Sequence, residues 1–137
     1  MENIEFIARD LSDFNATAES ASFDFITSFD AVHDQAQPLN LLKGIYHALH
    51  DDGVYLMQDI KGSSHVHKNM DHPMAPFLYT ISCMHCMTVS LAQDGEGLGA
   101  MWGEEKTHEY LQSAGFTSVE TNELEHDIAN NWYVVRK

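Results

Sequence analysis

Basic residues are scarce in this chain of 137 residues. Lysine and arginine together number 7, against 21 aspartates and glutamates, which leaves a formal net charge of −14. Proteins that bind nucleic acids or anionic membranes hold the phosphates with clustered lysine and arginine side chains, whereas the basic residues here are scattered. We therefore expect neither nucleic acid nor a membrane among the partners.

Long apolar runs and a secretory signal are also missing. No apolar stretch reaches the roughly 18 residues that cross a bilayer. The opening residues, "MENIEFIARD", lack a basic segment followed by an apolar one. The length suits one domain, so we expect residues 1–137 to form a single domain in the cytoplasm.

Cysteine is limited to Cys83 and Cys86, in the stretch "SCMHCM". A C-x-x-C pair can be a redox couple or half of a zinc site. A structural zinc site needs about four ligands, and the sequence has no second pair. The two cysteines fall in an apolar run typical of a helix, where residues three apart share a face. We interpret both as buried core thiols and assign no metal ligand.

Hydrophobic periodicity predicts strands and helices in alternation. Strands are expected at Ile4–Ala8, Phe23–Phe29, Val54–Ile60, Phe116–Leu124 and Asn131–Lys137. Helices are expected from Pro38 to Leu49, at Phe77–Leu91 and at Glu104–Ala114, the last closed by Gly115. The order predicts an α/β fold whose sheet is mostly parallel, with a terminal antiparallel hairpin and helices on both faces. The strand at Phe23–Phe29 is apolar on both faces, which is typical of a central parallel strand.

The helix that begins at Pro38 carries one apolar stripe. Its members recur at helical spacing and are Leu39, Leu42, Ile45, Tyr46 and Leu49. Such a stripe predicts packing against the sheet.

Polar residues follow the predicted strand ends, where ligands bind in α/β sheets. They are Asp10, Asp30, His33, Asp34 and Asp59. In the Asp-x-x-His pattern of Asp30 and His33, the carboxylate can orient the imidazole as a general base near neutral pH. In the alternative interpretation, Asp30 and Asp34 cap the following turn and His33 packs against the sheet.

Two other segments invite a functional interpretation. The long polar segment Lys61–Pro76 contains His65, His67 and His72, and imidazoles are good ligands for zinc, copper or nickel; the alternative is a solvated loop. The stretch "GEGLG", Gly95 to Gly99, has the glycine spacing of a nucleotide loop. Because it follows a helix and not a strand, we interpret it as a linker.

Several stretches together resemble class I S-adenosylmethionine-dependent methyltransferases. The stretches are "NIEFIARDLSDF", "FDFITSFDAVHDQAQPLNLLKGIYHALHDDGVYLMQDI", "GLGAMWGEEKTHEYLQSAGFTSVE" and "NWYVVRK". The resemblance covers nearly the whole chain and implies the Rossmann-like sheet of that family, from its third strand onward. It also implies S-adenosylmethionine as cofactor and a small-molecule methyl acceptor.

The resemblance also implies which residues serve the site. Asp10 matches the acidic residue near the cofactor's adenine, and Leu11 lies beside it. Ser28, Phe29, Asp30 and His33 match the strand end at the methionine part of the cofactor and the substrate. Asp30 and His33 are the candidate catalytic residues because of their Asp-x-x-His pattern.

One part of the family pattern has no counterpart in this sequence. The glycine-rich cofactor loop and the first two strands should precede Ile4–Ala8, but only Met1, Glu2 and Asn3 do. We therefore expect an incomplete cofactor site, a chain that is inactive alone, and a strand edge at Phe23–Phe29 that is free to pair with a second copy. The alternatives are a truncated, catalytically inactive homologue that acts as a dimerising binding or structural module, and a metal-binding protein built on the His-rich loop.

Overall fold

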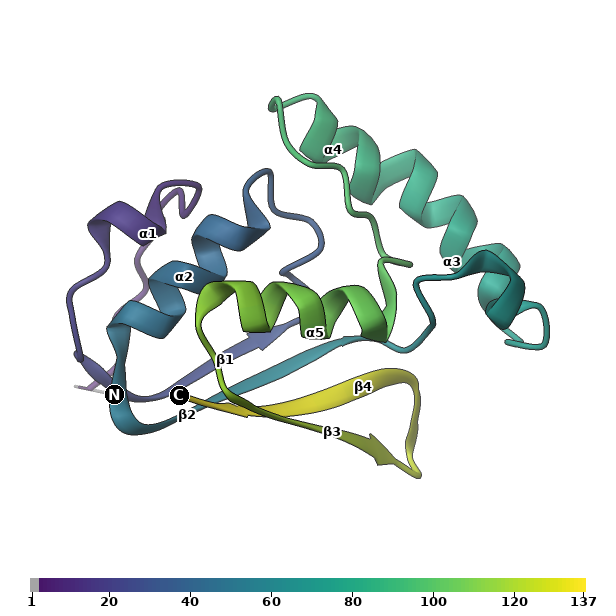
Figure 1. Cartoon of the computed structure of the whole chain (residues 1–137). Helices are drawn as coiled ribbons and strands as arrows, with labels where there is room; N and C mark the ends of the chain where they lie inside the picture. The colour runs from purple at the N-terminus through teal and green to yellow at the C-terminus, as the bar shows by residue number, and fades with distance from the viewer. Residues whose placement is uncertain (1–2) are drawn as a thin grey trace.

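A mixed sheet of four strands organises the molecule, in the order β1-β2-β4-β3 (Figure 1). The computed structural model describes residues 3–137. β1 (Phe23–Phe29) runs parallel to β2 (Leu49–Ile60), whereas β4 (Asp127–Arg136) is antiparallel both to β2 and to β3 (Ser118–Leu124). The predicted α/β class and terminal hairpin are confirmed. Among the described strands only the β1–β2 pairing is parallel, so the sheet is less parallel than predicted.

The helices lie on one face of this sheet (Figure 1). They are α1 (Phe14–Thr17), α2 (Pro38–Ala48), a 3-10 turn η1 (Val66–Asn69), α3 (Ala75–Ile81), a π-helical turn η2 (Ser82–Cys86), α4 (Met87–Leu91) and α5 (Gly103–Ala114). Within residues 3–137 no helix covers the opposite face, where helices were also expected. No described helix has both the length and the apolar character that a membrane crossing requires.

The hydrophobic core lies between the sheet and helices α2 and α5. The predicted stripe of α2 is confirmed, because Leu42 and Ile45 are buried and Leu39 and Tyr46 pack at the margin. The stripe meets Leu111 of α5 and the fully buried aromatic and aliphatic side chains of β2 and β4, which are Tyr55, Met57, Tyr133 and Val135.

β2 begins earlier than the predicted strand Val54–Ile60, because the ladder with β1 already starts at Leu49. Phe23 pairs with Leu49, and Phe25 pairs with Val54. The intervening residues bulge out of the ladder at this end of the strand. The opposite end, which carries the polar residues, keeps a regular register.

The predicted strand Ile4–Ala8 is wrong. This segment has no regular secondary structure, and Ile4, Phe6 and Ile7 are 54%, 95% and 71% exposed. A strand needs a partner for its backbone groups, and no described strand lies beside this segment. For the same reason β1 forms an edge of the sheet and is not the central strand that its composition predicted.

Candidate functional site

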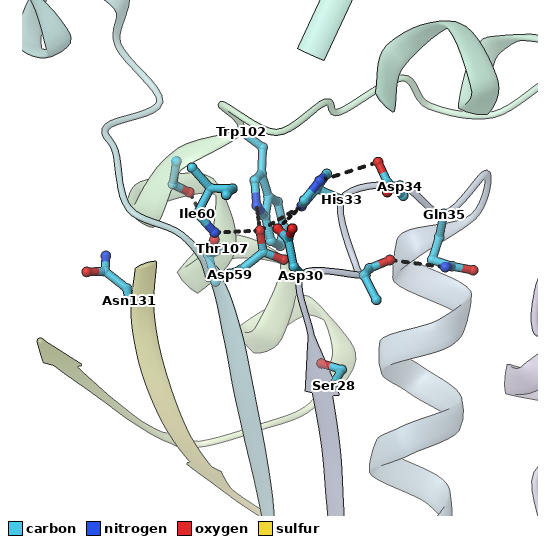
Figure 2. A network of polar contacts seen from close by, with 12 residues as sticks. Ser28, Asp30, His33, Asp34, Gln35, Asp59, Ile60, Trp102, Thr107 and Asn131 are labelled. Atoms are coloured by element: carbon cyan, nitrogen blue, oxygen red, sulfur yellow. Dashed lines mark hydrogen bonds and ion pairs between the residues drawn. The ribbon is translucent and has the colours of Figure 1, made fainter. Parts of the chain in front are cut away.

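The carboxyl ends of β1 and β2 carry the candidate site (Figure 2). β1 ends directly before Asp30, and the loop that follows it carries His33 and Asp34. Asp59 is the penultimate residue of β2. Because the two strands are parallel, these four side chains are brought together at one edge of the sheet, as predicted.

Asp30 redirects the chain at the end of β1. Its φ is 49°, in the left-handed region, where aspartate is among the more tolerated residues. Its amide still donates to the carbonyl oxygen of Gln58 at 2.9 Å. The ladder therefore continues to this residue while the chain turns, and the turn places His33 over the end of β2.

His33 and Asp59 form a buried pair. The distance between His33 Nδ1 and Asp59 Oδ1 is 2.7 Å, and the two residues are 2% and 0% exposed. The same carboxylate oxygen accepts from Trp102 Nε1 at 3.2 Å and from the amide of Ile60 at 2.8 Å. Because an ionised carboxylate only accepts hydrogen bonds, Nδ1 is the donor and Nε2 of the neutral ring carries the lone pair.

Asp30 does not hydrogen-bond the imidazole. Its Oδ1 is 3.9 Å from His33 Nδ1, so Asp59 holds the position that the Asp-x-x-His pattern predicted for Asp30. Burial raises the pKa of Asp30, and the carboxylates of Asp59 and Asp34 raise it further against the effect of His33.

The carboxylates around His33 raise its pKa. Burial alone would lower it, but the hydrogen bond to Asp59 and the charges of Asp59, Asp34 and Asp30 outweigh burial. Asp34 Oδ1 lies 3.3 Å from His33 Nε2. Among the described groups, the buried oxygens Asp34 Oδ1 and Asp59 Oδ2 accept no hydrogen bond.

A cavity of about 450 Å³ opens above this pair. Its polar lining residues are Asp30, His33, Asp34, Gln58, His85, Cys86 and Asn130. Its apolar wall comes mainly from the segment around α3 and consists of Ile60, Met74, Phe77, Leu78, Ile81, Ala100 and Ala129. The cavity can hold a small molecule of mixed character, with a polar group over His33.

A second cavity, of about 430 Å³, lies between β1 and α2. Most of its lining is apolar, and its residues are Leu11, Phe14, Phe23, Phe25, Ile26, Thr27, Ser28, Ala31, Gln35, Leu41 and Ile45. It adjoins the first cavity across the end of β1, because Ala31 lines one and Asp30 the other.

The structure separates the predicted cofactor residues. Leu11 and Ser28 line the second cavity, where the hydroxyl of Ser28 lies 2.6 Å from that of Tyr55. Phe29 is 54% exposed and packs edge-on against Trp132. Asp10 lines neither cavity; its carboxylate accepts from the amide of Ser12 at 2.9 Å, which lowers its pKa.

The His-rich loop does not form a metal cluster. His65 and His67 have ring centroids 5.8 Å apart, and His72 Nδ1 accepts from the amide of Met74. Within residues 3–137, the groups of three potential ligands that converge all contain His33 and none includes these histidines.

Glu105 anchors that loop to the start of α5. Its carboxylate accepts from the Ser64 amide at 2.7 Å, the Ser63 hydroxyl at 2.8 Å and Lys68 Nζ at 3.0 Å. Burial acts to raise the pKa of Glu105, but these hydrogen bonds outweigh it and hold the pKa well below its ordinary value.

Replacing Glu105 by glutamine is expected to lower the free energy of unfolding at pH 7 by about 1 kcal/mol, since the side chain is 41% exposed and its charge is partly screened. The pKa of Glu105 is lower in the folded chain than in the unfolded chain, where it is about 4.3. The ionised carboxylate therefore stabilises the fold fully above this pH, and the stabilisation is lost progressively as the pH falls below it. The difference between wild type and Glu105→Gln in urea unfolding should therefore shrink between about pH 5 and pH 2. Glu109→Gln, at the exposed pair with Lys106, should show a smaller difference; equal effects would contradict the anchoring role.

The two cysteines do not share a face, contrary to prediction. Cys83 is exposed and Cys86 is buried, because the helix widens into a π turn between them, and the wider turn changes the angle between residues three apart. Burial, followed by the nearby Asp34, raises the pKa of Cys86 to about 11. Cys86 lines the first cavity, which the sequence did not indicate.

The contacts of Asp59 with His33 and Trp102 are the other feature that sequence reasoning missed. Asp59 could be placed at the rim, because it ends an apolar strand. Its pairing with His33, 26 residues away, and with Trp102, 43 residues away, follows only from the parallel register and the path of the chain into α5.

Comparisons with known proteins identify the family and the fold. The family model described as "Methyltransferase domain" matches residues 1–115. None of the curated proteins matches the chain.

Solved structures share the fold. A structure of an O-methyltransferase family protein from Burkholderia thailandensis is 13% identical, with a TM-score of 0.70, and the match covers 99% of this chain and 36% of that one. Human N-acetylserotonin methyltransferase in complex with SAM is 20% identical, with a TM-score of 0.65 and coverages of 100% and 34%. The trans-methyltransferase CalH in complex with SAH is 18% identical, with a TM-score of 0.67 and coverages of 99% and 36%. The chain thus spans about a third of the length of these structures.

Proposed function

Because this chain belongs to the methyltransferase domain family, we propose that it forms part of an S-adenosylmethionine-dependent methyltransferase that acts on a small molecule. The observation that carries the proposal is the buried His33–Asp59 pair beneath a cavity of about 450 Å³. Two structural neighbours are described in complex with SAM or SAH, which supports the choice of cofactor.

The cavity between β1 and α2 fits the cofactor in its chemistry. Its lining is mostly apolar, which suits an adenine ring, and the polar groups of Ser28 and Gln35 lie among the lining residues. Leu11 and Phe14 would contact the ring. The exposed Asp10 carboxylate, which precedes Leu11 but lies outside the cavity lining, would accept a hydrogen bond from a part of the nucleoside that extends beyond the cavity. The bound cofactor would supply a methyl group on a positively charged sulfur.

The residues of this chain would handle the acceptor. The apolar wall from α3 would shield it from water, and a hydroxyl, amine or thiol of the acceptor would lie over His33. Nε2 would take the proton that the acceptor loses as it is methylated. Asp59 would hold the ring in the required tautomer and stabilise the imidazolium that forms. A role for Asp30, whose carboxylate also lines the cavity, stays a prediction.

Calorimetric titration of the purified chain with S-adenosylhomocysteine tests the proposal, because this product binds without reacting. We expect saturable binding, weaker by about tenfold or more in Asp10→Asn through the loss of one charged hydrogen bond. Glu5→Gln, at an exposed carboxylate of the same extended segment, is the matched control and should bind as the wild type does. If the folded protein gave no heat of binding at millimolar S-adenosylhomocysteine, cofactor binding by this chain would be contradicted.

A second candidate function is supported by the exposed edge of β1. Phe23, Phe25 and Phe29 are 51%, 57% and 54% exposed, and within residues 3–137 no strand pairs with the outer edge of β1. Unpaired apolar edges pair readily with another chain. We propose that two copies associate here.

Sedimentation at increasing protein concentration tests this association. Wild type should shift from monomer toward dimer, and Phe25→Lys should shift the transition to higher concentration. Phe77→Lys is the control, since Phe77 is equally exposed at 58% but lies on α3, away from the edge. A wild type that stays monomeric, or equal effects of both variants, would contradict the proposal.

A further inference from the structure

A second cluster of potential ligands lies on the far side of His33 from Asp59. His33, Asp34 and Cys86 each offer one ligand atom, and these atoms all lie within 4.8 Å of one another. His33 and Cys86 are buried. The cluster joins the loop after β1 to the π turn η2, and π turns occur frequently at functional sites.

The thiol of Cys86 interacts with the side chain of Asp34, but within residues 3–137 Asp34 Oδ1 is left without a hydrogen bond. Asp59 holds the proton of the neutral ring on Nδ1, so the lone pair of His33 Nε2 faces Asp34 Oδ1 across 3.3 Å. That carboxylate oxygen is buried and, among the described groups, accepts no hydrogen bond. Two acceptors in contact repel one another unless a proton or a cation lies between them.

We infer that His33, Asp34 and Cys86 form a binding site for a zinc-like divalent cation. Imidazole nitrogen, carboxylate oxygen and thiolate sulfur are the three ligand types of zinc. A tetrahedral ion with bonds of about 2.0–2.3 Å holds its ligands about 3.3–3.8 Å apart, so small side-chain movements close the site. Binding forms the sulfur–zinc bond and releases the Cys86 thiol proton to solvent.

The surroundings complete the arrangement expected of a metal site. The hydrogen bond from His33 Nδ1 to Asp59 is the carboxylate–histidine contact that commonly orients a metal-binding imidazole. All three ligands line the cavity of about 450 Å³, so a water or a substrate group in the cavity would supply the fourth ligand, as in catalytic zinc sites.

Metal binding and the proposed proton transfer use the same atom. A zinc ion bound to Nε2 would block transfer of the acceptor's proton to that nitrogen, so we expect zinc to inhibit methyl transfer. The inference goes beyond the proposed function, and titration of the metal alone needs neither cofactor nor acceptor. A failure of the chain to bind metal is therefore distinguishable from failure of the methyltransferase proposal.

The test is titration of the purified, reduced full chain with Zn²⁺ against a chromogenic chelator, and with Co²⁺ by absorption. We expect one ion per chain and a near-ultraviolet sulfur-to-cobalt charge-transfer band. Cys86→Ser should abolish the band, and Cys86→Ser and Asp34→Asn should each weaken zinc binding about tenfold or more. Cys83→Ser, at the exposed cysteine of the same helix, should change neither measurement.

Three results would overturn the inference. They are the absence of zinc binding to the folded wild type, a cobalt band lost in Cys83→Ser but kept in Cys86→Ser, and zinc binding lost in the double variant His65→Gln, His67→Gln. The last would move the site to the His-rich loop. Because Asp34→Asn keeps the size of a side chain that is 35% exposed, it tests the site even if Cys86→Ser fails to fold.

Discussion

Replacing Asp59 by alanine is expected to lower the free energy of unfolding by about 3–5 kcal/mol, the usual cost of removing one partner of a buried charged pair. Asp59 is fully buried, and its Oδ1 accepts from His33, Trp102 and the amide of Ile60. The alanine would leave these three donors without an acceptor in the interior. Urea unfolding at pH 7, followed by circular dichroism, measures the change.

Two further variants make this result specific. Asp59→Asn keeps one oxygen acceptor, so its loss of stability should be smaller than that of alanine. Asp52→Ala removes an exposed carboxylate of the same strand and should change the free energy of unfolding by less than about 0.5 kcal/mol. If Asp59→Ala were no more destabilising than Asp52→Ala, the buried pair would not hold the site together.

Replacing His33 by alanine is expected to slow methyl transfer by about 10²- to 10⁴-fold, which is the usual contribution of a general base. The rate would be measured as release of S-adenosylhomocysteine by a catalytically active form of the protein. A panel of phenols, alcohols and thiols would serve as methyl acceptors. Because His33 lines the acceptor cavity and not the cavity beside β1, the affinity for S-adenosylhomocysteine should be nearly unchanged.

His126→Ala is the matched control for the rate. His126 lies in the exposed turn between β3 and β4, so its removal should leave the rate unaltered. A His33→Ala protein that keeps the wild-type rate with the best acceptor would contradict proton transfer through His33. A variant that loses rate only in proportion to its loss of cofactor affinity would assign His33 a structural role.

Local patterns predicted most of the elements and the edge of the sheet at which the polar residues of the candidate site lie. Residues that are close in the sequence encode the apolar stripe of α2, the start of α2 at Pro38 and the strands on either side of this helix. Gly115 ends α5 in a left-handed conformation, as the sequence predicted. The acidic residues at the strand ends could be assigned to one rim, because parallel strands end at the same edge of a sheet.

The contacts inside the site depend on tertiary register, which local patterns do not encode. Asp30 is three residues from His33, yet Asp59 makes the hydrogen bond, because β2 places its end directly under the imidazole. The π turn that buries Cys86 and exposes Cys83 has no signature in an apolar run. The segment Ile4–Ala8 has a strand-like composition, but composition does not supply the partner that a strand requires.

The arrangement at His33 underlies the proposals for both proton transfer and metal binding, and nitrogen NMR of a histidine-labelled chain tests it most directly. Spectra would be recorded without metal at rising pH until the shifts of His33 no longer change, so that the ring is neutral, and His33 would be assigned by its absence in His33→Gln. We expect His33 to carry its proton on Nδ1, and we expect Asp59→Asn to remove this preference. A proton on Nε2 in the wild type would contradict this arrangement, because the lone pair would then face away from both the cavity and Asp34.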